Sequence, residues 1–209
     1  MFEKLETRSM ISHPFNMVVA GPSQSGKTWW VMRLLSNPQM IEPRIEKIIY
    51  HYSEWQPTYE KMNNVEFVKG LPGDLPDGKQ RTLLILDDLM TESSNNPEIT
   101  LLFTRGTHHR NCSVVLIAQN FFEKGLRTIT LNSHYLVLMK NRRAISQIRA
   151  LSSQLYEKKS KFLVEAFEDA SLASHGYLFI DLKQNTEENL RVRSNIFSES
   201  GWPPIVYTL

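Results

Sequence analysis

The chain has 209 residues, 41% of them apolar and 22% charged, and its net charge of +2 is only weakly basic. These proportions argue against a disordered chain and favour one globular domain, and the weak charge permits a polyanionic partner without requiring one. The single cysteine, Cys112, excludes an intrachain disulfide, favours a reducing compartment, and is interpreted as a small residue of the core.

Strands and helices are predicted to alternate along most of the chain, which favours an α/β fold with a mainly parallel central sheet and helices on both faces. Residues 1–13 are expected to form an N-terminal arm, and residues 14–209 a single domain. The predicted elements, in chain order, are a strand over 15–20, a helix over 26–36, strands over 45–52 and 65–68, a loop over 71–78, a strand over 83–86, a loop over 91–96, a helix over 97–109, strands over 113–118 and 135–139, helices over 142–157 and 159–168, and a strand over 176–182.

The turn between the first strand and the first helix matches the phosphate-loop pattern G-x-x-x-x-G-K-[ST] in full. Its two glycines let successive backbone N–H groups point at phosphates, and the following helix adds the positive end of its dipole. Lys27 is expected to reach the β- and γ-phosphates, and Thr28 to offer its hydroxyl to magnesium. The sequence therefore predicts an ATP site formed by Gly21, Pro22, Ser23, Gln24, Ser25, Gly26, Lys27 and Thr28.

Two acidic residues, Asp87 and Asp88, directly follow the apolar run of residues 83–86. A strand ending there would hold Asp87 beside Thr28, where its carboxylate can orient magnesium. Asp88 is the candidate to polarise the attacking water. Many P-loop motors carry Glu at that place, and Asp is shorter by one methylene, which limits its reach.

Gln119 comes directly after another predicted buried strand, residues 113–118. A polar residue at the end of a central strand can contact the γ-phosphate or the lytic water, so Gln119 is a further catalytic candidate. The alternative is a strand-end residue that caps a turn.

Several segments together resemble the poxvirus-type DNA-packaging ATPases, and especially the versions in Polinton/Maverick elements and virophages, within the FtsK–HerA superfamily. The similarity extends from about Pro14 to Phe197. It is carried by the phosphate loop, by Leu-Asp-Asp-Leu-Met at 86–90, Phe-Thr-Arg-Gly-Thr-His-His-Arg-Asn at 103–111, Ile-Ala-Gln-Asn at 117–120, Leu-Arg-Thr at 126–128 with Leu-Asn-Ser at 131–133, and Arg-Val-Arg-Ser-Asn at 191–195. The resemblance implies a RecA-like core, ATP hydrolysis, an oligomeric ring, and threading of double-stranded DNA into a capsid.

Ring ATPases of this kind complete each site with an arginine, often from the neighbouring subunit, because a guanidinium stabilises charge on the transferring phosphoryl group. The resemblance makes Arg105, Arg110 and Arg127 candidates for this role, although each could instead form a surface or interface ion pair. His108 and His109 have no accompanying cysteine or carboxylate cluster, so packing or hydrogen bonding is expected of them rather than metal binding.

Basic residues crowd into a short stretch in which Glu157 is the only acid: Lys140, Arg142, Arg143, Arg149, Lys158, Lys159 and Lys161. Such a cluster could neutralise DNA phosphates without reading sequence, as a packaging motor requires, or it could be a solvated helix face.

The predicted function is thus an ATP- and Mg²⁺-dependent motor that moves double-stranded viral DNA into a preformed capsid. It would act as a homo-oligomeric ring, a pentamer or hexamer, at a capsid or portal vertex. The alternatives are a nucleotide-gated DNA- or capsid-binding protein with slow turnover, and a small-molecule or nucleotide kinase, for which neither an arginine-bearing lid nor an acceptor pocket is evident. No apolar run approaches the ~20 residues of a membrane span, so a soluble intracellular protein is expected. The resemblance implies a location in the host cell at the site of virion assembly, or in the virion.

Overall fold

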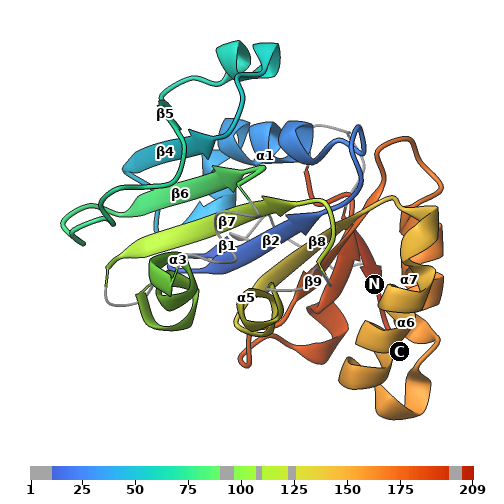
Figure 1. The fold of residues 1–209 in the computed structure, drawn as a ribbon. Helices are drawn as coiled ribbons and strands as arrows, with labels where there is room; N and C mark the ends of the chain where they lie inside the picture. Colours follow the sequence, from blue (N-terminus) through green and yellow to red (C-terminus); the bar gives the residue numbers. More distant parts are fainter. Residues whose placement is uncertain (1–10, 90–96, 107–109, 122–125, 198–203) are drawn as a thin grey trace. The chain divides into compact units, whose positions relative to one another are not determined.

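A computed structural model describes residues 11–89, 97–106, 110–121, 126–197 and 204–209 (Figure 1). The chain divides into two compact units. The first contains Met1–Asn16 and Thr28–Val115, and the second contains Met17–Lys27 and Leu116–Leu209. The chain therefore changes unit within strands β2 (Asn16–Ala20) and β7 (Cys112–Ala118), and at the start of helix α1 (Lys27–Ser36).

The first unit contains the parallel strands β4 (Lys47–Tyr52), β5 (Glu66–Lys69) and β6 (Thr82–Asp87). With the first half of β7, their order is β7-β6-β4-β5. Every residue of β6 is buried, as expected of an apolar run covered on both faces. The strands predicted in this part of the sequence are confirmed to within a few residues.

Shorter elements of the first unit escaped prediction because they are too short to show a periodic pattern. Strands β1 (Ile11–Ser12) and β3 (Ile41–Glu42) form a separate parallel pair. Two 3-10 helices, η1 (Pro38–Met40) and η2 (Pro57–Lys61), begin with proline, which suits a first helical turn.

The helix predicted over residues 97–109 is built as α3 (Pro97–Leu101), continued by the π-helical turn η3 (Leu102–Gly106). Ile99, Leu102 and Phe103 are buried, so the predicted apolar face is present. The loop predicted over 91–96 and the histidines His108 and His109 lie outside the described residues.

The second unit has the strand order β11-β10-β9-β8-β2-β7, with the second half of β7 at one side. Strand β8 (Tyr135–Met139) is parallel to β2, as predicted. Strands β9 (Tyr177–Asp181), β10 (Val192–Ser194) and β11 (Ile205–Tyr207) each pair antiparallel with the strand before them. The sheet is therefore mixed, where the sequence predicts a mainly parallel one.

The change of direction follows from two consecutive helices. Helix α6 (Ile145–Leu155), with η4 (Arg142–Ala144) before it and η5 (Glu157–Lys159) after it, packs on α7 (Phe162–Ala170) (Figure 1). One crossover helix returns the chain for a parallel strand, whereas a second helix brings it back to the end from which it left. Strand β9 consequently starts beside the end of β8, where Lys140 N donates to Gly176 O at 2.8 Å.

Two further short elements of the second unit were not predicted, helix α5 (Arg127–Leu131) and the 3-10 turn η6 (Glu188–Leu190). None of the helices in the described ranges is long and apolar enough to cross a membrane.

A buried ion pair joins β9 to β10. Arg193 Nη2 lies 3.2 Å from Asp181 Oδ2, and both side chains are almost fully buried. The guanidinium also lies over the ring of Phe179, 5.2 Å from its centroid. Nearby, Arg191 donates to the backbone oxygens of Asp181 and Lys183. The two arginines of the 191–195 segment therefore tie the antiparallel strands and their connection together.

Cys112 is fully buried at the start of β7, which confirms its interpretation as a core residue. Burial raises the pKa of its thiol to about 12, so the reactive thiolate is only about one part in 10⁴ at pH 8. We expect the native protein to resist a thiol reagent such as dithionitrobenzoate and the urea-unfolded protein to react with one equivalent. Rapid labelling of the native chain, measured by absorbance, would contradict this burial.

Candidate nucleotide-binding site

The phosphate loop connects the end of β2 to the start of α1. Gly21 N donates to Ala118 O at 3.1 Å, so the loop leaves the sheet beside the end of β7, and Ser25 N turns back to Pro22 O at 3.2 Å. Gln24 and Gly26 adopt positive φ angles of 64° and 96°. Such left-handed positions turn successive N–H groups to one side, which is the arrangement that binds anions.

Both glycines of the motif have packing reasons as well. A Cβ atom on Gly21 would lie 2.6 Å from Met139 Cβ and 2.7 Å from Ser25 Oγ. At Gly26 the positive φ strains any side chain, and a Cβ would lie 3.0 Å from His175 Nδ1. At these two positions, the glycine that the phosphate-loop pattern requires is therefore also the residue that the backbone and its neighbours require.

Lys27 is the first residue of α1, and its ammonium group points back over the loop. Nζ donates to Gly21 O at 2.7 Å and to Pro22 O at 3.0 Å. A bound phosphate would offer the ammonium a charged acceptor, and a charge-assisted hydrogen bond is stronger than one to a neutral carbonyl. The Lys27 ammonium therefore lies over the loop, and its contact with the β- and γ-phosphates remains a prediction.

Gln119 is exposed at the end of β7, in the same unit as the loop. Gln119, Asn120 and Gly21 line one small cavity of about 10 Å³, together with Met139 and Asn141. The structure thus places Gln119 next to the first residue of the phosphate loop. This position suits a side chain that contacts nucleotide phosphate or water.

His175 was not predicted. Its Nδ1 lies 3.3 Å from Ser25 O, and its φ of 55° turns the chain sharply before β9. The next residue must be glycine, because a Cβ on Gly176 would lie 2.1 Å from Ala170 O. The loop before β9 is therefore held against the phosphate loop, a contact that joins residues far apart in the sequence.

Asp87 is the last residue of β6, in the first unit, and is only 4% exposed. Its Oδ2 accepts hydrogen bonds from two phenol groups, Tyr50 Oη at 2.5 Å and Tyr59 Oη at 2.9 Å. Burial, and then the charge of Asp87, raise the pKa of both tyrosines, so their hydroxyls remain protonated donors. Neither tyrosine was predicted from the sequence as a site residue.

Asp88 differs from its neighbour in every respect. It is exposed, and its φ of 55° lies in the left-handed region that aspartate tolerates better than most residues. The turn after β6 therefore separates one buried carboxylate from one that faces solvent. The roles predicted for them, a metal-orienting group and a group that contacts water, remain predictions.

The donor set suits magnesium. Mg²⁺ prefers oxygen ligands and is usually held by one or two carboxylates together with phosphate oxygens and waters. Asp87 offers a carboxylate that already accepts hydrogen bonds from Tyr50 and Tyr59. Thr28 offers a half-buried hydroxyl in the first turn of α1. The oxygen chemistry of both residues therefore fits magnesium, and the site itself remains a prediction.

The three candidate arginines lie in different settings. The backbone of Arg105 belongs to η3, and its side chain lies outside the described part. Arg110 is half-buried, and its Nη1 donates to Pro76 O at 3.3 Å. Arg127 is exposed at the start of α5. The arginine-finger role remains a prediction for each of them.

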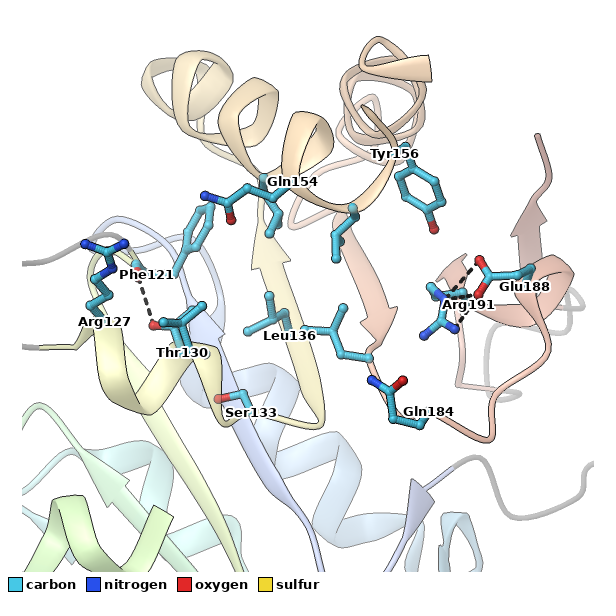
Figure 2. A pocket seen from close by; sticks show the side chains of 14 residues that line it. Phe121, Arg127, Thr130, Ser133, Leu136, Gln154, Tyr156, Gln184, Glu188 and Arg191 are labelled. Carbon is cyan, nitrogen blue, oxygen red and sulfur yellow. Dashed lines mark hydrogen bonds and ion pairs between the residues drawn. The ribbon is translucent and has the colours of Figure 1, made fainter. Parts of the chain in front are cut away.

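Arg127 also lines a cavity of about 990 Å³, which Figure 2 shows from close by. Its other walls include Leu136, Tyr156 and Leu182, and Arg191 and Glu188 form an ion pair of 2.6 Å at its far side. Leu182 follows the end of β9, at the end of the sheet where β2 and β8 begin. No residue of the phosphate loop lines this cavity, although Phe121 lines both it and the small cavity beside Gly21.

No protein-family model matches the chain, and no curated protein is significantly similar to it in sequence. Solved structures are similar in fold. The genome packaging NTPase B204 of Sulfolobus turreted icosahedral virus 2, in complex with AMP, aligns with a TM-score of 0.56 and 13% identity over 87% of this chain and 96% of that chain. The same NTPase in complex with ATP-gammaS aligns with a TM-score of 0.53 and 14% identity over 82% of this chain and 94% of that chain. B204 of Sulfolobus turreted icosahedral virus, a DNA-packaging ATPase, aligns with a TM-score of 0.53 and 12% identity over 93% of this chain and 98% of that chain.

Proposed function

We propose that this chain, which shares the fold of the viral genome-packaging NTPase B204, is an ATP-hydrolysing motor that moves double-stranded DNA into a preformed capsid. The observation that carries the proposal is the complete phosphate loop between β2 and α1, with Lys27 directed over it. Its core would be RecA-like, built on the parallel strand pairings and extended by the antiparallel strands beyond β8.

The residues have distinct roles in hydrolysis. The N–H groups of the loop and Lys27 bind the β- and γ-phosphates and stabilise the charge of the transition state. Thr28 and Asp87 would hold magnesium, which would supply positive charge to neutralise the phosphate oxygens. Asp88 accepts a hydrogen bond from the attacking water, and Gln119 contacts that water or the γ-phosphate.

DNA would be held by its phosphates. The basic residues Arg142, Arg143, Arg149, Lys158, Lys159 and Lys161 are all exposed, around α6 and η5. A packaging motor must bind every sequence, and phosphate contacts of this kind position DNA without reading bases. In a ring of five or six copies, Arg105, Arg110 or Arg127 of one copy would complete the site of the next. The ring would act at a capsid or portal vertex where virions assemble.

The test is steady-state ATP hydrolysis with and without double-stranded DNA. We expect DNA to stimulate turnover several-fold, and the stimulation to fall steeply between 50 and 200 mM salt, because phosphate contacts release counterions. The triple variant Arg142→Ala/Arg143→Ala/Arg149→Ala should need more DNA for half-maximal stimulation than the control Lys79→Ala. Turnover that DNA leaves unchanged in the wild-type chain would contradict a motor.

A nucleotide-gated scaffold is the second candidate, favoured by Asp88, whose side chain is shorter than the glutamate of many P-loop motors. Such a protein would bind ATP and assemble on DNA or a capsid but turn over slowly. Tight ATP binding without DNA-stimulated hydrolysis would identify it. Phosphate transfer to nucleoside monophosphates would instead identify a kinase.

A further inference from the structure

The hydroxyl groups of Tyr50 and Tyr59 both donate hydrogen bonds to the carboxylate of Asp87, at the end of β6. We propose that Tyr50 and Tyr59 are positioning residues that fix the orientation of Asp87 for magnesium, an inference that rests on the proposed ATPase function. The two hydroxyls donate to the same oxygen, Oδ2, at 2.5 and 2.9 Å.

The register of the sheet explains how Tyr50 comes to this place. In the parallel pair of β4 and β6, Tyr50 lies opposite Ile85, and Tyr52 lies opposite Asp87. Side chains alternate along a strand, so Tyr50, Tyr52, Ile85 and Asp87 share one face. Tyr50 therefore reaches Asp87 diagonally across neighbouring strands, a contact that long aromatic side chains can make.

Tyr59 comes from a different element, η2, which lies between β4 and β5. Its ring stacks on Phe67 of β5, with centroids 5.4 Å apart and an interplanar angle of 22°. It also lies 4.9 Å from the ring of Tyr50. The carboxylate is thus held by donors from two separately anchored elements, which restrains its rotation more than a single hydrogen bond would.

The hydroxyl groups are not needed to fill space. Phe67 packs against both Tyr50 and Tyr59 in the same cluster without one. A buried hydroxyl also costs free energy unless it finds a partner, and here both partners are the one oxygen of Asp87. Two hydroxyls are therefore present in an aromatic cluster that also contains Phe67, and their shared target is the predicted metal residue.

Magnesium makes strict demands on such a residue. It requires near-ideal octahedral geometry, so a carboxylate that turns freely binds it less well. Partners behind a metal ligand typically contribute a factor of roughly 10–100 in metal affinity or activity. Neither tyrosine belongs to the phosphate loop, so we expect nucleotide binding without metal to be independent of their hydroxyl groups.

The experiment measures binding of the non-hydrolysable analogue AMPPCP by calorimetry, in EDTA and across a Mg²⁺ titration. We expect the double variant Tyr50→Phe/Tyr59→Phe to need about 10–100 times more Mg²⁺ for half-maximal enhancement of binding. Its affinity in EDTA should match the wild type. Each single variant should lie between the two.

Tyr52→Phe is the matched control, because it removes a hydroxyl from the same face of β4. In the part of the chain that the structure describes, that hydroxyl makes no hydrogen bond to Asp87. A double variant with the Mg²⁺ requirement of Tyr52→Phe would overturn the inference. So would an affinity that falls equally in Mg²⁺ and in EDTA, because that pattern reports lost packing. If Mg²⁺ does not change the affinity of the wild type for AMPPCP, the magnesium site itself is refuted.

Discussion

Replacing Lys27 with alanine should lower the rate of ATP hydrolysis by a factor of about 10²–10³, which corresponds to about 3–4 kcal/mol of transition-state stabilisation. The ammonium is the only cationic group that the loop itself contributes, and it already lies 2.7 and 3.0 Å from the carbonyls of Gly21 and Pro22. In the proposed mechanism, its charge would stabilise the negative charge that grows during phosphoryl transfer. The measurement is kcat and KM for ATP at saturating Mg²⁺.

Lys79→Ala is the control for loss of positive charge, because Lys79 is exposed and pairs only with the surface residue Asp77 among the described residues. It should retain wild-type kinetics. Because Lys27 also joins two loop carbonyls, the thermal midpoint of Lys27→Ala should be measured beside its activity. A folded Lys27→Ala variant that hydrolyses ATP at the wild-type rate would rule out this loop as the catalytic site.

Replacing Arg193 with methionine should lower the free energy of unfolding by about 3 kcal/mol, the lower end of the range for breaking a buried ion pair. The change leaves the nearly inaccessible carboxylate of Asp181 without its cationic partner. The lower end applies because Arg193 Nε is itself buried without a hydrogen-bond partner among the described residues, and methionine removes that defect. Urea denaturation measures the loss.

The double variant Arg193→Met/Asp181→Asn should recover part of the stability. It removes the unpaired negative charge of residue 181. Asparagine keeps an oxygen for Lys183 N, which donates to Asp181 Oδ1 at 3.0 Å. Arg149→Met, which changes an exposed arginine of α6, is the control and should alter stability by less than about 0.5 kcal/mol. If Arg193→Met changed the free energy of unfolding as little as this control, the ion pair would not stabilise the contact between β9 and β10.

The phosphate loop could be predicted residue by residue because phosphate chemistry fixes its residue types and spacing. The strands that precede Gly21, Asp87 and Gln119 could be predicted as well, since each is a continuous apolar run that the sheet buries. These three runs end beside residues that the sequence predicts for the site.

The direction of β9 could not be predicted in the same way. Alternating strands and helices indicate a parallel sheet, but residues 142–168 form two helices that pack on each other, and the second one reverses the return of the chain. Both helices are visible in the sequence, and only their consequence for the sheet was missed. Strands β10 and β11 are too short to leave a pattern.

The partners of Asp87 were hidden for another reason. The run that contains Tyr50 is read as a strand, and period-two alternation places Tyr50 and Tyr52 on one face without saying which of them touches the carboxylate. Tyr59 lies in the 3-10 turn η2, which has no sequence periodicity. Contacts that depend on register and on irregular segments follow from the three-dimensional structure alone.

The aromatic cluster around Asp87 also has an optical consequence. Trp55 is 49% exposed, and its ring meets that of Tyr59 edge to face at 5.4 Å. The indole is thus a natural chromophore one ring away from the phenol that holds the carboxylate. Its emission depends on its surroundings, so a chain that keeps Trp55 as its sole tryptophan would carry a built-in fluorescent reporter. Stopped-flow recording of that signal would time events at Asp87 without any added dye.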